Sequence, residues 1–244
     1  MEFDETTFGK IYAEEYDELH DPGTTEASVA LIAELASGDR LLEFAIGTGR
    51  MALPLLKRGF QISGIEGSAE MAAKLHEKPG GEDICIEIGD MATTKTEGEF
   101  DFAFLVFNTL FNLTSQSAQI QLFKNAAEHL TPGGRFLIET FVPDMDRFDD
   151  TNSVRALNVG FQSAWLEATD HDPVQQRVNI QRIRFSPGST NLFPLQMRYA
   201  WPQEIDLMAQ LAGLELEHRW GGWHREPFTR DSKMHVSLYH KPQG

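Results

Sequence analysis

Residues 41–50 read Leu-Leu-Glu-Phe-Ala-Ile-Gly-Thr-Gly-Arg, and this stretch decides the fold. An apolar run typical of a buried strand meets two closely spaced glycines, Gly47 and Gly49, and the segment 51–58 then has helical periodicity. Glycine lacks a Cβ, so the backbone can approach a ligand closely, and the start of the next helix offers unpaired N–H groups. The pattern predicts a nucleotide-type binding site between a strand and a helix.

Strand and helix patterns alternate around this stretch, from residue 40 to about residue 142. Ser68 is a helix-start signal, and Thr131-Pro132-Gly133-Gly134 is a stop followed by a turn. Such alternation predicts a parallel sheet with helices on both faces. The expected strands are 40–46, 60–66, 84–88, 100–107 and 135–141, and the expected helices are 50–58, 68–77 and 115–130.

The period changes between residues 144 and 201, where apolar and polar residues alternate and turn signals such as Ser186-Pro187-Gly188-Ser189 separate the runs. This predicts an antiparallel meander with strands at 161–169, 177–185 and 192–201. A helix from Pro202 to Ala212 and strands at 214–220 and 234–240 follow. We therefore expect an α/β core at 1–143 and 202–244, with an N-terminal helical lid, and an inserted β cap over the substrate at 144–201.

Charge and composition exclude several classes of partner. The chain has 244 residues and a net charge of −16, with 21 Lys and Arg against 37 Asp and Glu. No cluster of basic residues could neutralise phosphates, so we expect neither nucleic acid nor an anionic membrane as a partner. The acidic start Met1-Glu2-Phe3-Asp4-Glu5 is unlike a signal peptide, and no apolar run reaches membrane-span length. We expect a cytoplasmic protein, either a monomer or a homodimer.

The single cysteine, Cys85, has no partner for an internal disulfide, and no Cys/His spacing suggests a metal site. Its apolar surroundings, Ile84-Cys85-Ile86, favour a core residue over a nucleophile. Six histidines, other than His20 and His224, have no ligand spacing, and most are expected at the surface.

Acidic residues decide which nucleotide suits the glycine turn. Gly47 to Ala52 fits the dinucleotide fingerprint G-x-G-x-x-G/A, with Glu66 placed as a ribose acceptor. However, Glu43 lies inside the first strand, and Asp90 follows the third. Because ligands bind beyond the carboxyl ends of parallel strands, these three acids are expected to converge. Together they would repel a diphosphate and suit a sulfonium that carries an ammonium group.

The motifs together resemble those of class I S-adenosylmethionine-dependent methyltransferases, over about residues 40–142. The resemblance implies a Rossmann-like seven-stranded sheet of order 3-2-1-4-5-7-6 with the last strand antiparallel. The meander is similar to that of the small-molecule branch, which includes sugar N-methyltransferases and glycine N-methyltransferase-like enzymes. The five matching segments are Glu43–Gly49, Ile65–Ser68, Gly89–Met91, Phe100–Leu110 and Leu130–Phe136.

The resemblance implies S-adenosyl-L-methionine as the cofactor and assigns roles to the motif residues. Glu66 would take the ribose hydroxyls, Asp90 the adenine amine, and Met91 would pack on the ring. Three residues of this site have a simpler alternative role. Asp90 could begin a turn, Glu43 could accept hydrogen bonds from backbone donors, and Arg50 could be a solvated residue at the start of a helix. The full cofactor-binding set is Glu43, Ala45, Gly47, Gly49, Arg50, Glu66, Gly67, Asp90, Met91, Phe107 and Tyr16.

The acceptor site is less sharply indicated. His224 and His20 are candidate catalytic bases, because the pKa of histidine lies near working pH. The function predicted is methyl transfer to an N or O atom of a small molecule, such as a natural product or a sugar. The alternatives are an NAD(P)-dependent oxidoreductase and a non-catalytic ligand-binding protein on the same fold. The candidate substrate-binding residues are Tyr12, Asn108, Glu139, Arg198, Trp223 and Arg225.

Overall fold

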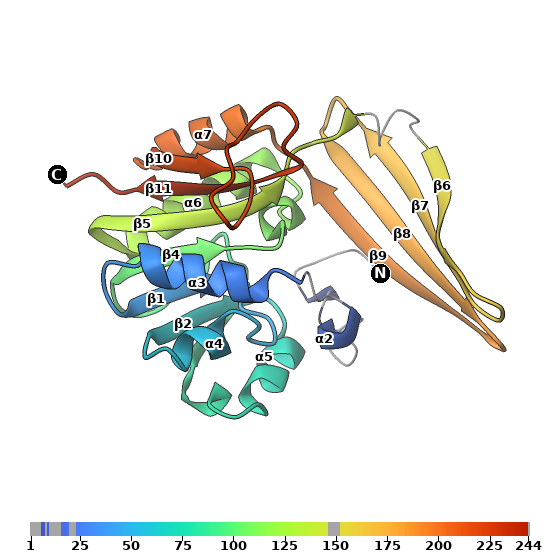
Figure 1. Ribbon diagram of the computed structural model, residues 1–244, viewed down its shortest axis with the longest axis horizontal. Coiled ribbons are helices and arrows are strands. Elements are labelled where there is room, and N and C mark those ends of the chain that lie inside the picture. Colours follow the sequence, from blue (N-terminus) through green and yellow to red (C-terminus); the bar gives the residue numbers. More distant parts are fainter. Residues whose placement is uncertain (1–5, 8, 10–15, 20–22, 146–151, 244) are drawn as a thin grey trace.

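The computed structural model describes residues 6, 7, 9, 16–19, 23–145 and 152–243 (Figure 1). Tyr12 and His20 therefore lie outside the described residues. The main sheet consists of β1 (Arg40–Phe44), β2 (Gln61–Glu66), β3 (Cys85–Ile88), β4 (Phe100–Leu105), β5 (Leu130–Phe141), β10 (Glu215–Trp220) and β11 (Met234–His240). The helical elements are α2 (Tyr16–Leu19), α3 (Thr25–Leu35), α4 (Ala52–Leu56), α5 (Ala69–His76), η1 (Gly81–Asp83), η2 (Thr109–Asn112), α6 (Gln116–His129) and α7 (Pro202–Leu211).

The main sheet has the order β10-β11-β5-β4-β1-β2-β3. Strands β1 to β5 pair parallel with one another, whereas β11 pairs antiparallel with β5. If the inserted strands are left out of the numbering, this is the order 3-2-1-4-5-7-6 with an antiparallel last strand. The predicted α/β fold and its strand order are confirmed.

Two apolar layers bury both faces of this sheet. Successive residues of a strand point to opposite faces, so Leu41 and Leu42 enter different layers. Leu41 packs with α3, α4 and α5, through residues such as Ile32, whereas Leu42 packs with α6 and α7, through residues such as Phe123. A sheet buried on both faces explains why its central strands are continuous apolar runs.

A second sheet is inserted between β5 and α7, and Figure 1 shows it standing beside the core. It contains β6 (Asn152–Val159), β7 (Ala164–Asp172), β8 (Arg177–Ser186) and β9 (Ser189–Arg198), all antiparallel in sequential order. Val178, Ile180 and Met197 pack into the layer that also holds α6 and α7. We call β6–β9 the cap sheet.

Several local predictions are wrong. Cys85 is exposed, because β3 is an edge strand of the main sheet and its side chains are incompletely covered. His129, His171 and His235 are buried, so half of the six remaining histidines are not surface residues. The segment Thr131–Gly134 is no separate turn but the beginning of β5, where the pairing with β4 is irregular.

Ser68 caps α5 as predicted, and its Oγ accepts the N–H of Met71 at 3.2 Å. Among the residues that the structure describes, none of the helices has the length and apolar character that a membrane span requires.

Candidate active site

The glycine turn after β1 is held open by the carboxylate of Glu66 at the end of β2. Gly47 N–H donates to Oε2 of Glu66 at 2.8 Å, and Ser68 N–H donates to Oε1 at 2.9 Å. Ala45, Gly47 and Gly49 have φ values of 53°, 57° and 83°. A Cβ on Gly49 would lie 2.8 Å from Leu75 Cγ, so the turn fits against α5 only with glycine at this position. Glu66 thus joins the motifs around Gly47 and Gly67.

Glu43 and Arg50 lie near enough to this turn and to each other for the charge of Arg50 to act on the Glu43 carboxyl. Glu43 is 3% exposed, and within the described part of the chain its Oε2 has no hydrogen-bond partner. Burial raises the pKa of Glu43 well above its usual value, and the nearby charge of Arg50 opposes the rise. Arg50 Nη1 donates to Thr25 Oγ1 at 3.1 Å. A buried, half-satisfied carboxylate is expensive, so a ligand is the expected partner.

Tyr16, in α2, lies close to these charges. Burial raises the pKa of Tyr16 to about 12, with Arg50 lowering it and Glu66 raising it. The next residue, Asp17, accepts from Thr48 Oγ1 at 2.5 Å and so attaches α2 to the glycine turn. This contact places α2 beside the glycine turn, and its role as a lid stays a prediction.

Asp90 follows β3, and its carboxylate begins a turn. Oδ1 accepts the N–H of Ala92 at 2.8 Å, and the carbonyl of Asp90 accepts from Thr93 and Thr94. Met91 packs partly buried against the core. Both residues lie at the carboxyl edge next to Glu66, whose carbonyl accepts the N–H of Gly89 at 2.9 Å. The turn uses Oδ1 of Asp90, so the other carboxylate oxygen can still accept a hydrogen bond from a ligand.

The ends of β4 and β5 meet at Phe107, Asn108 and Glu139. Phe107 N–H donates to Oε2 of Glu139 at 2.7 Å, and Arg50 lies 5.1 Å from the centroid of the Phe107 ring. Burial raises the pKa of the Glu139 carboxyl, against the lowering effects of the Phe107 N–H and of Arg50. Phe107 and Asn108 have φ values of 64° and 61°, a conformation that costs about 1–3 kcal/mol for each residue.

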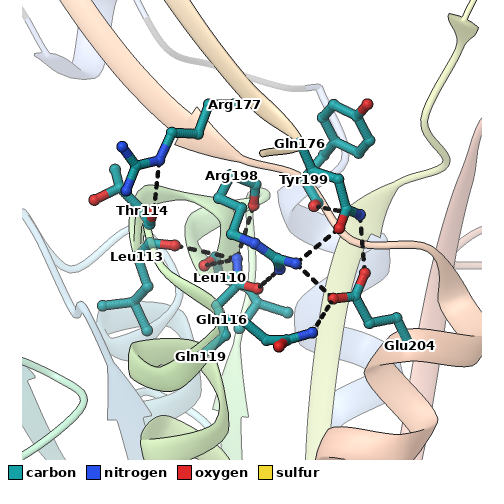
Figure 2. A network of polar contacts seen from close by, with 10 residues as sticks. All are labelled: Leu110, Leu113, Thr114, Gln116, Gln119, Gln176, Arg177, Arg198, Tyr199 and Glu204. Atoms are coloured by element: carbon teal, nitrogen blue, oxygen red, sulfur yellow. Dashed lines mark hydrogen bonds and ion pairs between the residues drawn. The ribbon is translucent and has the colours of Figure 1, made fainter. Parts of the chain in front are cut away.

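Arg198 is held in a polar network between the cap sheet and the core (Figure 2). Its guanidinium donates to Gln119 Oε1 at 2.7 Å, to Gln176 Oε1 at 2.8 Å and to Glu204 Oε1 at 2.6 Å. Gln119 also donates to the carbonyl of Arg198 at 2.7 Å. Hydrogen bonds from Arg198, Gln176 and Gln116 outweigh burial and lower the pKa of Glu204. Arg198 therefore joins β9 to α6 and α7, and a role as substrate clamp stays a prediction.

The loop between β10 and β11 opens at the carboxyl edge of β5, because Met234 pairs with Phe141. Trp223 nevertheless packs in the apolar layer of α3, and it is 5% exposed. Arg225 pairs with Glu34 of α3 at 2.9 Å. These two side chains and His224 line a groove of about 540 Å³ along α3. The structure brings them together with α3, and contact with an acceptor stays a prediction.

Two features of the site were missed by sequence reasoning. The first is the cluster of Asp17, Thr48 and Lys78, whose members are far apart in the chain. The second is the left-handed backbone at Phe107 and Asn108. An asparagine directly after an apolar strand was the one signal for the second, since asparagine tolerates this conformation better than most residues.

Comparisons with known proteins agree with this geometry. A family model described as a methyltransferase domain matches residues 41–134. The structure of the CcbJ methyltransferase from Streptomyces caelestis superposes with a TM-score of 0.92 at 36% identity, over 98% of this chain and 100% of that chain. The chain belongs to the class I S-adenosylmethionine-dependent methyltransferase family.

This methyltransferase is also similar to the cypemycin N-terminal methyltransferase of a Streptomyces species, with 28% identity over 200 residues and 80% of each chain covered. An amino pentose methyltransferase from Micromonospora echinaspora, solved with S-adenosylmethionine bound, shares the fold with a TM-score of 0.69 at 18% identity, over 99% of this chain and 98% of that chain. Each of these relatives is named as a methyltransferase.

Proposed function

We propose that this methyltransferase uses S-adenosyl-L-methionine to methylate a nitrogen or oxygen atom of a small molecule at the carboxyl edge of its main sheet. The main support for this proposal is the buried Oε2 of Glu43. This atom has no hydrogen-bond partner among the described residues and lies near the charge of Arg50. A carboxylate and a guanidinium in the same region, with no ion pair between them, match the ammonium and carboxylate groups of an amino acid.

The residues present fit the rest of this cofactor. Glu66 would hold the ribose hydroxyls with the lone pairs that its two backbone donors leave. Asp90 would accept from the adenine amine, and Met91 would pack on the ring. Ala45, Gly47, Gly49 and Gly67 would bring the backbone close to the ligand. Tyr16 and Phe107 would cover its amino-acid end, since both lie near Arg50.

When bound, S-adenosyl-L-methionine supplies an electrophilic methyl group on a sulfonium, which the acceptor atom attacks in line. The part of the protein is then to bind, align and exclude water. α2, which contacts the glycine turn, would cover the site, and Asn108 and Glu139 border the end where β4 and β5 meet. An amine acceptor needs only to be neutral, so this edge needs no base for it. For a hydroxyl acceptor, His224 and His20 stay the predicted bases.

We further propose that the segment 144–201 acts as a substrate cap on the core formed by 1–143 and 202–244. In Figure 1, α2 lies in the space between the core and the cap sheet. The Arg198 network supports a fixed position for this sheet beside the core. The names of the cypemycin and amino pentose relatives favour a natural-product or sugar amine as the acceptor. Tyr12 and Trp223 remain candidate contacts for it.

Isothermal titration calorimetry with S-adenosylhomocysteine and with NADH tests the cofactor. We expect the first to bind and the second not, and we expect Glu43→Gln to weaken binding while Glu128→Gln, on the surface of α6, leaves it unchanged. The reverse preference would identify an oxidoreductase.

A transfer assay with methyl-labelled S-adenosyl-L-methionine tests the reaction. The acceptor panel would contain amino sugars, peptide N-termini, aliphatic amines, phenols and alcohols. We expect label on an amine. Binding of the cofactor without label on any compound would favour a ligand-binding protein on this fold.

A further inference from the structure

The turn that follows β4 has a backbone shape that its sequence does not favour. Phe107 and Asn108 both lie in the left-handed region, with φ values of 64° and 61°. Asparagine enters this region readily, but phenylalanine rarely does. Strained backbone persists only where surrounding contacts hold it, and it collects at functional sites. The structure must therefore contain the contacts that hold this turn.

Those contacts come from the end of β5. The Phe107 N–H donates to the Glu139 carboxylate at 2.7 Å, and the Asn108 N–H donates to the Glu139 carbonyl at 3.2 Å. In return, the Phe141 N–H donates to Asn108 Oδ1 at 2.5 Å. Glu139 thus receives both consecutive N–H groups of the strained turn, one on its side chain and one on its backbone.

The turn also contacts Arg50. The guanidinium of Arg50 lies 5.1 Å from the centroid of the Phe107 ring, a cation–π distance. Its Nη1 is bound to Thr25 at the start of α3. Phe107 therefore contacts Glu139 through its backbone N–H and Arg50 through its ring.

We propose that Glu139 is a positioning residue whose carboxylate holds the Phe107–Asn108 turn, and so fixes the distance between the methyl donor and the acceptor. This inference rests on the proposed function, because it assumes that transfer occurs where β4 and β5 end. Glu139 acts through the turn and has no proton to transfer in this role. Its oxygen is required as an acceptor of the Phe107 N–H, and its charge is not.

Two substitutions separate this role from that of a base or an ammonium-binding group. Glu139→Gln keeps an oxygen that can accept the Phe107 N–H, whereas Glu139→Ala removes it. For a positioning residue, we expect kcat of Glu139→Gln within about threefold of the wild type, and kcat of Glu139→Ala lower by tenfold or more, since misplacement by about 1 Å can cost up to 100-fold. Equal loss in both variants would show that the charge itself is needed and would overturn the proposal.

Amide hydrogen exchange measured by NMR gives a readout that needs no acceptor. In Glu139→Ala the Phe107 amide should exchange at least tenfold faster than in the wild type, because it loses its hydrogen bond, and in Glu139→Gln it should stay protected. Unchanged exchange at Phe107 in Glu139→Ala would contradict the proposal. Glu217→Ala is the matched control, since Glu217 pairs with Arg135 outside the site.

The second contact between the turn and β5 provides an independent variant in case Glu139→Ala does not fold. Asn108→Ala removes the acceptor of the Phe141 N–H, and Asn108→Asp retains it. We expect faster exchange at Phe141 and lower kcat only in Asn108→Ala; equal kcat in both variants would contradict the role of the turn. S-Adenosylhomocysteine should bind Glu139→Gln and Asn108→Asp within about threefold of the wild type, because these two variants keep the turn beside Arg50. If it binds none, including the wild type, the proposed function fails rather than the role of Glu139.

Discussion

Lys78 Nζ lies 2.5 Å from Asp17 Oδ2, and this ion pair connects the short helix α2 to the segment just after α5. The same ammonium donates to the carbonyl of Thr48 at 2.8 Å, inside the glycine turn. Burial by itself would raise the pKa of the Asp17 carboxyl, but the hydrogen bonds from Lys78 and Thr48 have the larger effect. The pKa of Asp17 is therefore below its usual value, and the carboxyl stays ionised. α2 and the glycine turn are therefore held by one shared set of charges.

Removal of the ion pair between Lys78 and Asp17 should speed the release of S-adenosylhomocysteine, the product that the cofactor becomes after methyl transfer. The two side chains are 31% and 53% exposed, and exposed pairs contribute about 0.2–1 kcal/mol. We expect Lys78→Ala to raise the dissociation rate of S-adenosylhomocysteine by about two- to fivefold, with little change in melting temperature. Stopped-flow displacement measures the rate. Lys57→Ala, an exposed lysine after α4, is the control, and an equal effect there would point to net charge alone.

Glu43 is expected to lower stability while it supports binding. Because burial raises its folded pKa above 4.5, the ionised form is disfavoured by folding, and stability is lost as pH rises through that folded pKa. Glu43→Gln should therefore raise the melting temperature at pH 7.5 by about 2–4 °C, as expected for about 1 kcal/mol in a chain of this size. The gain should shrink below pH 4.5. A variant that is less stable at every pH would refute this assignment.

His235 should make the protein sensitive to mild acid. Its Nε2 lies 2.8 Å from Thr140 Oγ1 and its Nδ1 lies 2.8 Å from Ser237 Oγ. Burial, helped by the charge of Arg219, lowers the pKa of His235 to about 3 from 6.5. The stability that depends on the neutral ring is complete above pH 6.5 and is lost as pH falls toward 3.

Urea denaturation at pH 7, 6 and 5 tests this sensitivity. Each pH unit below 6.5 should cost the wild type about 1.4 kcal/mol from this group. His235→Gln should remove that part of the slope, and His218→Gln, on the exposed side of β10, should keep it. Parallel pH slopes for the wild type and His235→Gln would rule out the effect.

Arg198 should matter more for stability than for acceptor affinity. Its side chain is 8% exposed and that of Glu204 is 19% exposed, so removal of one partner leaves a buried charge, at a cost of about 3–5 kcal/mol. We expect Arg198→Ala to unfold at lower urea and Arg198→Met/Glu204→Met to recover much of the loss. Arg225→Ala, which breaks the exposed pair with Glu34, should cost about 0–1 kcal/mol. A normal urea midpoint with a raised acceptor KM would favour the substrate clamp.

The sequence predicts best where a local rule acts alone. The glycine turn, the Ser68 cap and the strand 234–240 follow from backbone freedom, capping and alternation, and the structure has them at those positions. β6 was missed because most of its side chains are exposed, so it has no alternating pattern. Cys85 was misplaced because its apolar neighbours suggested burial, although the implied sheet order already put this strand at an edge.

In the site, too, local rules predict some features, whereas others depend on packing. The acids at 43, 66 and 90 could be assigned to one edge, because parallel strands bring their carboxyl ends together. Which of them would lack a partner depends on packing, and the unpaired Oε2 of Glu43 is visible only in the structure. The contacts of Trp223 and Arg225 with α3, which the sequence did not predict, likewise depend on segments that are distant in the chain.

The arrangement of the Arg198 network has a consequence for how this enzyme can diverge. The chain leaves the core after β5, forms the cap sheet and returns to the core at α7 (Figure 1). The Arg198 network joins the base of this inserted sheet to the core (Figure 2). The hairpin turns at 160–163 and 187–188 lie outside this network and outside the residues that surround the glycine turn. Mutations there leave the Arg198 network and the residues around the glycine turn unaltered, so the tips of the cap sheet can diverge between relatives while its base is inherited unchanged.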